Sequence, residues 1–220
     1  MRERVVLLHG LDRDPASLLL LAQALERAHF DVMNLGYPSR AFPIEGLVGP
    51  LMQQAQTWLE DDVPLHFVGH SLGGILIRAW LGRRRPRQLG RVVQLASANQ
   101  GTVLVDWLRY LPGFTAYYGP AVLQLGTRSE SCVLTLPAVD YELGILAGNQ
   151  PALNDWFFSQ VILREPNDGK ITVASTRVSG MKAHGVLPVA HREMPSESSV
   201  IEQVVSFLQT GHFHASHVID

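Results

Sequence analysis

The sequence predicts an α/β fold in which helices cover both faces of a mostly parallel sheet. Three short runs of β-branched and aliphatic residues, at Val5–Leu8, Pro64–Val68 and Arg91–Ala96, are typical of strands buried on both faces. Amphipathic helical periods separate these runs. Strands and helices that alternate in this way favour a parallel sheet, because each crossover helix packs back onto the sheet.

Four helical stripes and two helix boundaries support this prediction. Asp14 followed by Pro15 is typical of an N-cap and a first helical residue, and Gly211 fits a C-cap. The stripes consist of Leu18, Leu21, Ala22 and Leu25; Leu47, Leu51, Ala55 and Trp58; Ile75, Leu76 and Ala79; and Ile201, Val204, Val205 and Leu208. The remaining expected strands are Asp31–Tyr37, Tyr141–Ala147 and His184–Ala190.

Length and composition indicate one globular domain over residues 1–220. A formal net charge of −2 argues against a broad electrostatic grip on nucleic acid. The single Cys132 cannot form an internal disulfide, which fits a reducing compartment. No apolar run is long enough to span a bilayer, and no signal peptide is recognisable. A cytoplasmic location is therefore expected, although a protein whose leader had been removed would look the same.

One serine lies at the joint between an expected strand and an expected helix. The pentapeptide Gly69-His70-Ser71-Leu72-Gly73 matches Gly-x-Ser-x-Gly, which at a strand-to-helix turn is typical of a nucleophilic serine. The two glycines leave room for a sharp turn, and the helix N-terminus directs N–H groups at a developing oxyanion. A glycine-rich turn used only for packing is the alternative. We interpret Ser71 as the nucleophile.

The chain resembles the α/β-hydrolase superfamily, and within it the bacterial lipase and esterase group. The resemblance rests on Leu7-Leu8-His9-Gly10-Leu11, Gly69-His70-Ser71-Leu72-Gly73-Gly74, Asn99-Gln100-Gly101 and Asn167-Asp168-Gly169-Lys170. It covers nearly the whole chain and is strongest at the serine turn. It implies a minimal version of the fold, without the two leading antiparallel strands of larger members, and with a cap-like insertion at about residues 99–136.

The resemblance also implies the base of a catalytic triad, because the order along the chain in this superfamily is serine, acid, histidine. His191 lies just beyond the last expected strand and before the last helix, where the base belongs. His184 lies at the wrong end of that strand. His212, His214 and His217 follow the final helix, in a terminal tail of the kind that rarely holds the fixed geometry of a metal site.

The acid implied by the resemblance is Asp168. Asp168-Gly169-Lys170-Ile171 is similar to the acid segment of related lipases, with Lys170 at a commonly apolar position. A turn without catalytic function is the alternative reading, because Asn-Asp-Gly is also a turn sequence. The other carboxylates considered are Asp106, Asp140 and Asp155.

The oxyanion hole is expected to use two backbone N–H groups, those of Leu72 and, by resemblance, Leu11. Gly10 lets this second loop approach the substrate closely. The aromatic residues of the insertion are expected either to line an acyl pocket or only to pack the cap onto the sheet. The tentative pocket residues are Trp107, Tyr110, Phe114 and Tyr117.

Three functions remain open from the sequence. The first is a serine esterase or lipase that cleaves small-molecule esters or lipids with apolar acyl groups. The second keeps the triad but acts on a thioester, an amide or a lactone. The third is a non-catalytic binding protein of this fold. Hydrolysis by a triad of this kind needs neither a metal nor an organic cofactor.

Overall fold

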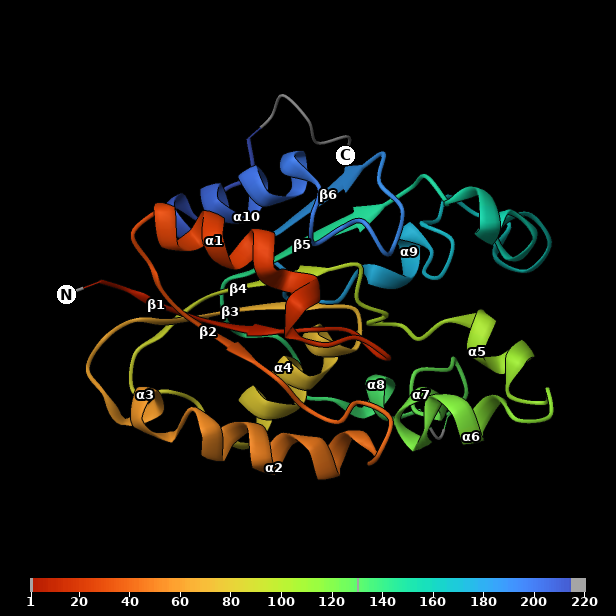
Figure 1. The fold of residues 1–220 in the computed structure, drawn as a ribbon, viewed down its shortest axis with the longest axis horizontal. Coiled ribbons are helices and arrows are strands. Elements are labelled where there is room, and N and C mark those ends of the chain that lie inside the picture. Colours follow the sequence, from red (N-terminus) through yellow and green to blue (C-terminus); the bar gives the residue numbers. More distant parts are fainter. Residues whose placement is uncertain (1, 130, 215–220) are drawn as a thin grey trace.

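A computed structural model describes residues 2–129 and 131–214. Within them, one sheet holds its strands in the order β2-β1-β3-β4-β5-β6, and every paired neighbour is parallel (Figure 1). The strands are β1 (Arg4–Leu8), β2 (Asp31–Leu35), β3 (Leu65–His70), β4 (Leu89–Leu95), β5 (Leu143–Gly148) and β6 (Ala183–Leu187). The predicted parallel sheet is confirmed.

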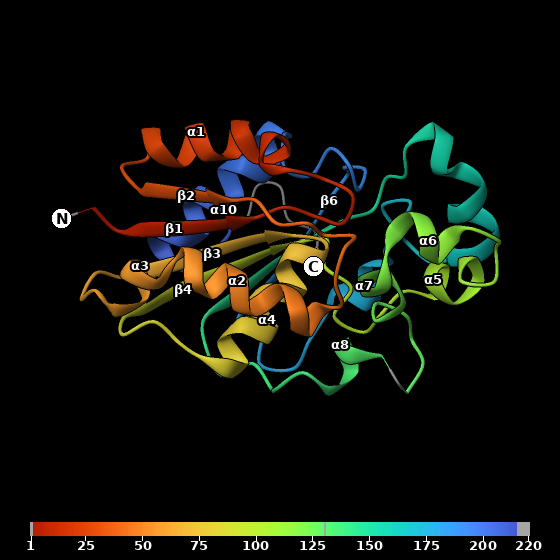
Figure 2. The same cartoon turned by 60° about the horizontal axis from the view of Figure 1, so that its bottom comes forward.

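Helices cover both faces of the sheet, as predicted. Figures 1 and 2 show α1 (Leu19–Arg27) and α10 (Ser198–Thr210) on one face, and α2 (Ile44–Gln54), α3 (Gln56–Glu60) and α4 (Leu72–Arg83) on the other. Two predicted helix boundaries are confirmed. The Asp14 side chain accepts a hydrogen bond from the Ala16 N–H at the start of the 3-10 turn η1 (Pro15–Leu18), and Gly211 ends α10 with φ of 79°.

The core has two halves, one on each side of the sheet. Val6 and Leu8 of β1 point into the half that holds Trp80 of α4. Val5 and Leu7 point into the half that holds Phe207 of α10. Since both faces of the sheet are fully covered, its strands consist of continuous apolar runs rather than of alternating polar and apolar residues.

Several element ends differ from the sequence prediction, and local hydrogen bonds or turns explain three of them. The helix expected to run through Ala55 is divided there into α2 and α3. The strand β2 ends at Leu35 rather than Tyr37, whose N–H points to the ring of His9 instead of to a strand. The strand β6 ends at Leu187, because the N–H of Val189 turns back to the Leu187 carbonyl.

The loops at the carboxyl ends of the strands carry most of the irregular structure. The insertion between β4 and β5 forms α5 (Val103–Leu108), α6 (Phe114–Tyr118), α7 (Pro120–Leu123) and α8 (Cys132–Thr135) (Figures 1 and 2). Between β5 and β6 lie η2 (Leu153–Asp155), η3 (Phe158–Leu163) and α9 (Val173–Thr176). This edge of a parallel sheet is where ligands bind in such folds. Across the described residues, no helix is both long and apolar enough to cross a membrane.

Candidate active site

Ser71 lies at a strained turn between β3 and α4. Its backbone has φ of 53° and ψ of −118°, a conformation that L-residues rarely adopt. The neighbouring glycines are required by space rather than by their own dihedral angles. A Cβ atom added to Gly69 would lie 2.4 Å from the backbone nitrogen of Gly74, and one added to Gly73 would lie 2.2 Å from the Leu8 carbonyl oxygen. Only glycine fits at either position.

Hydrogen bonds from β4 hold this turn in place. The Ser71 N–H donates to the Leu95 carbonyl oxygen at 2.8 Å, and the Ser97 hydroxyl donates to the Ser71 carbonyl oxygen at 2.8 Å. The Gln94 amide donates to the Gly74 carbonyl oxygen, also at 2.8 Å. Buried polar groups that are all paired in this way rigidify their surroundings.

Asn99 extends this network beneath the turn, which gives Asn99-Gln100-Gly101 a structural role. Its side-chain amide donates to the Gln94 side chain at 2.6 Å and to the Thr176 carbonyl oxygen at 2.7 Å. Its side-chain oxygen accepts from the guanidinium of Arg78 at 3.0 Å. Burial lowers the pKa of Arg78, which lies inside the protein at the base of the turn.

The structure brings Ser71, His191 and Asp168 together in one chain of hydrogen bonds. The distance from the Ser71 Oγ to the His191 Nε2 is 3.0 Å, and the distance from the His191 Nδ1 to the Asp168 Oδ2 is 2.7 Å. Asp168 is 1% exposed and His191 is 8% exposed. A buried carboxylate on Nδ1 fixes the tautomer in which Nε2 is free to accept the serine proton.

The loop that follows β5 holds the Asp168 carboxylate rigidly. Its Oδ1 accepts hydrogen bonds from the N–H groups of Lys170 at 2.9 Å and Ile171 at 2.8 Å, which leaves Oδ2 for the histidine. Gly169, at φ of 96°, makes this tight turn possible. The backbone N–H of His191 donates to the Asp168 carbonyl oxygen at 3.0 Å, so the two residues are joined by backbone as well as by side chain.

His70 supports the loop of His191, a contact that the sequence did not reveal. The His70 Nε2–H donates to the His191 carbonyl oxygen at 3.0 Å, and the two ring centroids are 4.9 Å apart. Burial, together with the nearby His191, lowers the pKa of His70 well below the usual value. The ring is therefore neutral and acts as a hydrogen-bond donor near the site.

The other histidines named in the sequence analysis have different surroundings. His184 is hydrogen-bonded to the Thr176 hydroxyl at 2.8 Å, and burial lowers its pKa to about 4. The ring of His212 bonds only the backbone of its own tail, at Thr210. His217 lies outside the described residues. In the described part of the chain, no three His, Cys, Asp or Glu side chains are grouped so that they could hold a metal.

The alternative carboxylates bind partners other than a histidine. Asp140 pairs with Arg85, and Asp106 accepts from the backbone N–H and hydroxyl of Thr127. Asp155 is buried, but it pairs with Lys170 at 2.6 Å.

The loop after β1 reaches the serine turn. His9 is buried, stacks on Tyr37 with ring centroids 4.1 Å apart, and donates from Nδ1 to the Gly10 carbonyl oxygen at 2.9 Å. A Cβ atom added to Gly10 would lie only 3.2 Å from the Ser71 Cβ, so the approach is close. Leu11, one of the two expected oxyanion donors, lines the cavity next to Ser71. Leu72, the other, is the first residue of α4.

A cavity of about 300 Å³ opens onto Ser71 and His191. Its apolar wall comes from the insertion and consists of Leu104, Val105, Leu108, Phe114, Tyr118, Val122 and Leu125. Its charged residues come from other loops and are Asp12, Arg13, Asp155, Lys170 and Arg192. Of the apolar wall, Phe114 was among the pocket residues expected from the sequence. The sequence did contain a signal for this wall. Leu104 and Leu108 of α5 are one helical turn apart, so they lie on the same face of the helix.

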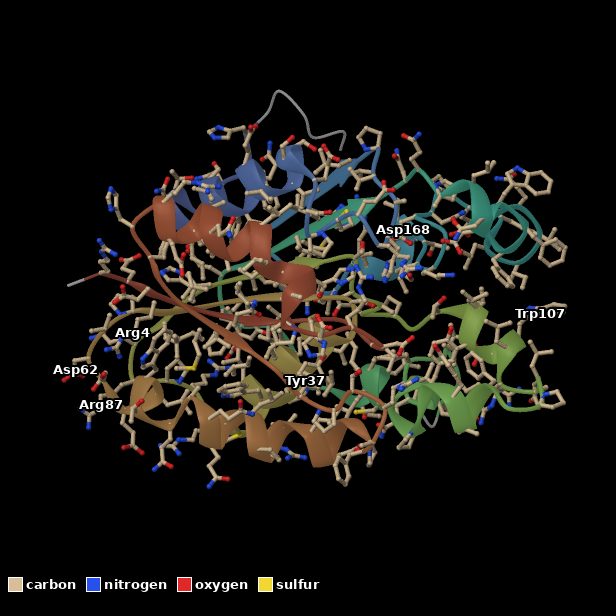
Figure 3. The ribbon with its side chains drawn as sticks, viewed as in Figure 1. Arg4, Tyr37, Asp62, Arg87, Trp107 and Asp168 are labelled. Carbon is tan, nitrogen blue, oxygen red and sulfur yellow. The ribbon has the colours of Figure 1, made fainter. Side chains whose placement is uncertain are left out.

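Three of the four aromatic residues expected at the pocket do not line this cavity. Trp107, Tyr110 and Tyr117 are more than half exposed. In Figure 3, Trp107 lies at the outer tip of the insertion, away from Asp168. Tyr117 donates to Asp12 at 3.3 Å and lies under the guanidinium of Arg40. The residues of α5 and α6 that line this cavity are instead Leu104, Val105 and Leu108 of α5, and Phe114 and Tyr118 of α6.

The chain is similar to known proteins in its structure rather than in its sequence. No family model matches the sequence, and no curated protein matches it. The mature Bacillus licheniformis lipase BlEst2 is similar in structure, with a TM-score of 0.66 and 17% identity over 94% of this chain and 89% of that chain. Phospholipase PlaB from Legionella pneumophila has a TM-score of 0.70 and 15% identity over 94% of this chain, which spans 60% of that protein.

A third similar structure belongs to work on the metagenome-derived lipolytic enzymes LipS and LipT. Its TM-score is 0.64, with 17% identity over 96% of this chain and 94% of that chain. These likenesses agree with the parallel strand order and the helices on both faces. The chain has the α/β-hydrolase fold.

The strain at Ser71 predicts that Ser71→Gly stabilises the protein relative to Ser71→Ala. Both variants lose the bond to His191, but only glycine tolerates the φ of 53°. We expect a gain of about 0.5–2 kcal/mol in the free energy of unfolding, since such strain costs about 1–3 kcal/mol and glycine adds about 0.5–1 kcal/mol of backbone entropy. Urea unfolding of the two variants measures this difference. A glycine variant that is the less stable of the two would contradict it.

The buried His184 predicts a pH dependence of stability. Its pKa is about 4 in the folded protein, against about 6.5 in an unfolded chain. Between these values the unfolded chain binds more protons, so the free energy of unfolding falls as the pH drops from about 6.5 towards 4. In His184→Gln this fall should be smaller, because the titrating group is gone. Chemical unfolding at a series of pH values, with wild type as reference, checks the slope; equal slopes would refute it.

Proposed function

We propose that this protein is a serine-dependent hydrolase of carboxylic esters with apolar acyl groups, an esterase or lipase. The observation that carries the proposal is the continuous hydrogen-bonded chain of Ser71, His191 and Asp168, which opens onto a cavity with an apolar wall. The lipase, phospholipase and lipolytic enzymes of similar fold agree with this class of reaction.

The first half of the reaction forms an acyl-enzyme. The Ser71 Oγ attacks the ester carbonyl carbon while the His191 Nε2 takes the hydroxyl proton. Asp168 holds the imidazole in orientation and stabilises the imidazolium. The tetrahedral intermediate then collapses, the bond to the alcohol oxygen breaks, and His191 gives its proton to the departing alcohol.

The second half releases the acid. Water attacks the acyl-enzyme as His191 accepts one of its protons, and collapse returns that proton to the Ser71 Oγ as the carboxylic acid leaves. Each step uses only water and groups of this chain.

We assign the oxyanion hole to the backbone N–H groups of Leu11 and Leu72. Leu72 begins α4, so its N–H belongs to the helix terminus that favours negative charge. We assign acyl binding to the wall formed by the insertion, with Phe114 among its residues. In this proposal residues 99–136 act as a cap within a single domain.

Two other functions make different predictions. The same triad acting on a thioester, an amide or a lactone would favour those substrates over oxygen esters of equal acyl length. A non-catalytic binding protein would not react with a fluorophosphonate, since only an activated serine is labelled. We favour the ester hydrolase, because the buried carboxylate, the base and the serine hydroxyl already form one continuous chain of hydrogen bonds.

The central test is Ser71→Ala with p-nitrophenyl esters of graded acyl length. We expect hydrolysis to fall by about three orders of magnitude or more in a folded variant, because the nucleophile is gone. Labelling by a fluorophosphonate probe should be lost in parallel. Acyl-CoA and anilide substrates in the same assay identify the scissile bond.

A folded alanine variant with near-wild-type turnover would show that Ser71 is not the nucleophile. If the wild-type protein is labelled by the probe but hydrolyses the thioester or the anilide faster than the ester, the second function would replace the proposed one.

The acid is tested by Asp168→Asn. Asparagine keeps the size of the side chain but removes its charge and favours the wrong histidine tautomer, so a loss in kcat of about several hundredfold is expected. Asp140→Asn is the control, because this exposed carboxylate pairs only with Arg85. Ester hydrolysis is measured with folding checked by circular dichroism. If Asp155→Asn were inactive while Asp168→Asn stayed active, the acid would be Asp155.

A further inference from the structure

Two arginines from opposite ends of the chain meet at the rim of the cavity. Arg13 lies in the loop after β1, and Arg192 directly follows His191. The Arg13 Nη2 donates to the Arg192 carbonyl oxygen at 3.2 Å, which ties the two loops together. Both residues line the cavity that opens onto Ser71.

These arginines differ from the other charges around the cavity, because no carboxylate pairs with them. Asp12 pairs with Arg40 at 3.4 Å, and Asp155 pairs with Lys170 at 2.6 Å. Within residues 2–129 and 131–214, neither Arg13 nor Arg192 has a carboxylate within ion-pair distance.

Arg13 also has an unused donor. Its Nε is buried and has no hydrogen-bond partner among the described residues. A buried donor without a partner is costly to the folded protein. Burial lowers the pKa values of His9 and His70, and the positive charge of Arg13 adds a smaller contribution in the same direction. An anion bound at this guanidinium would offset its charge.

We propose that Arg13 and Arg192 form a subsite for an anionic group, a carboxylate or a phosphate, on the alcohol portion of the ester. This inference rests on the proposed ester hydrolysis and names the substrate class of the same site. The guanidinium groups present forked donors that suit either anion.

Two arguments place the anion on the alcohol rather than on the acyl chain. His191 must protonate the departing alcohol oxygen, so the alcohol lies on the side of the histidine, and Arg192 is the next residue. The wall that the insertion contributes, which includes Leu104 and Leu125, is apolar and would exclude a charge. The anion therefore faces the arginines while the acyl chain enters the insertion.

The test compares esters that differ only in this group. One pair is a phenyl butanoate with a meta carboxylate against the same ester with a meta carboxamide. The other pair is butanoylglycerol phosphate against butanoylglycerol. The subsite predicts a higher kcat/KM for the anionic member, by about tenfold or more, and a preference that weakens between about 0.01 M and 1 M salt. The pair with the larger ratio identifies carboxylate or phosphate as the favoured anion.

The variants are Arg13→Gln, Arg192→Gln and Arg192→Lys. Each glutamine should lower the ratio of the two kcat/KM values about tenfold, while the lysine, which keeps the charge, retains most of it. Arg87→Gln is the charge-matched control, since Arg87 lies at the opposite end of the sheet from Asp168 (Figure 3). If the glutamine variants slowed both members of a pair equally, Arg13 and Arg192 would be a structural strap only and the inference would be wrong.

Binding separates this inference from the proposed function. Calorimetry with Ser71→Ala should show tighter binding of the anionic ester than of its neutral twin, and Arg13→Gln in that background should remove the difference. Hydrolysis of both twins without preference would overturn the subsite and leave the esterase intact. If the anionic ester binds more tightly than its neutral counterpart but no hydrolysis depends on Ser71, the proposed esterase function would be wrong and the anion subsite would stand. Equal binding of the two twins overturns the subsite, whatever the hydrolysis.

Discussion

The steric constraint at the start of α4 decides the rest of the site. The first turn of this helix passes so near the end of β1 that a single methyl group at Gly73 would meet the Leu8 carbonyl at 2.2 Å. This close approach places Ser71 against the loop of Gly10 and Leu11, to which we assign one of the two oxyanion donors. It also forces the serine into its strained backbone angles, which the hydrogen bonds from β4 maintain.

The parallel sheet supplies the remaining geometry. Because all of its paired strands run the same way, the loops after β1, β3, β5 and β6 emerge at one edge. Residues 120 positions apart in the chain can then share one hydrogen bond, as His191 and Ser71 do at 3.0 Å. A rigid scaffold with functional loops at one end is a common solution, since loops can change without loss of the core.

Much of this arrangement follows from the sequence, for physical reasons. The strands are continuous apolar runs and the serine turn needs glycine at fixed positions, so both leave a local pattern, and Asp168 and His191 follow from the chain order that the resemblance implies. The inward faces of the insertion leave no such pattern, because helices of four to six residues span barely one or two turns. The roles of His70 and Arg13 could not be predicted from the sequence, because each side chain donates to a backbone carbonyl oxygen more than 100 residues further along the chain.

The short helices of the insertion have a consequence for how the cavity wall behaves over time. Isolated helices of this length are not stable in water, so α5 to α8 persist only through their packing on the sheet and on one another. We therefore expect amide hydrogens in this wall to exchange with solvent through local openings, and those of the central strands β1, β3 and β4 to exchange mainly through unfolding of the whole protein. The cavity wall is thus expected to be less protected from exchange than β3, the strand that leads into the Ser71 turn.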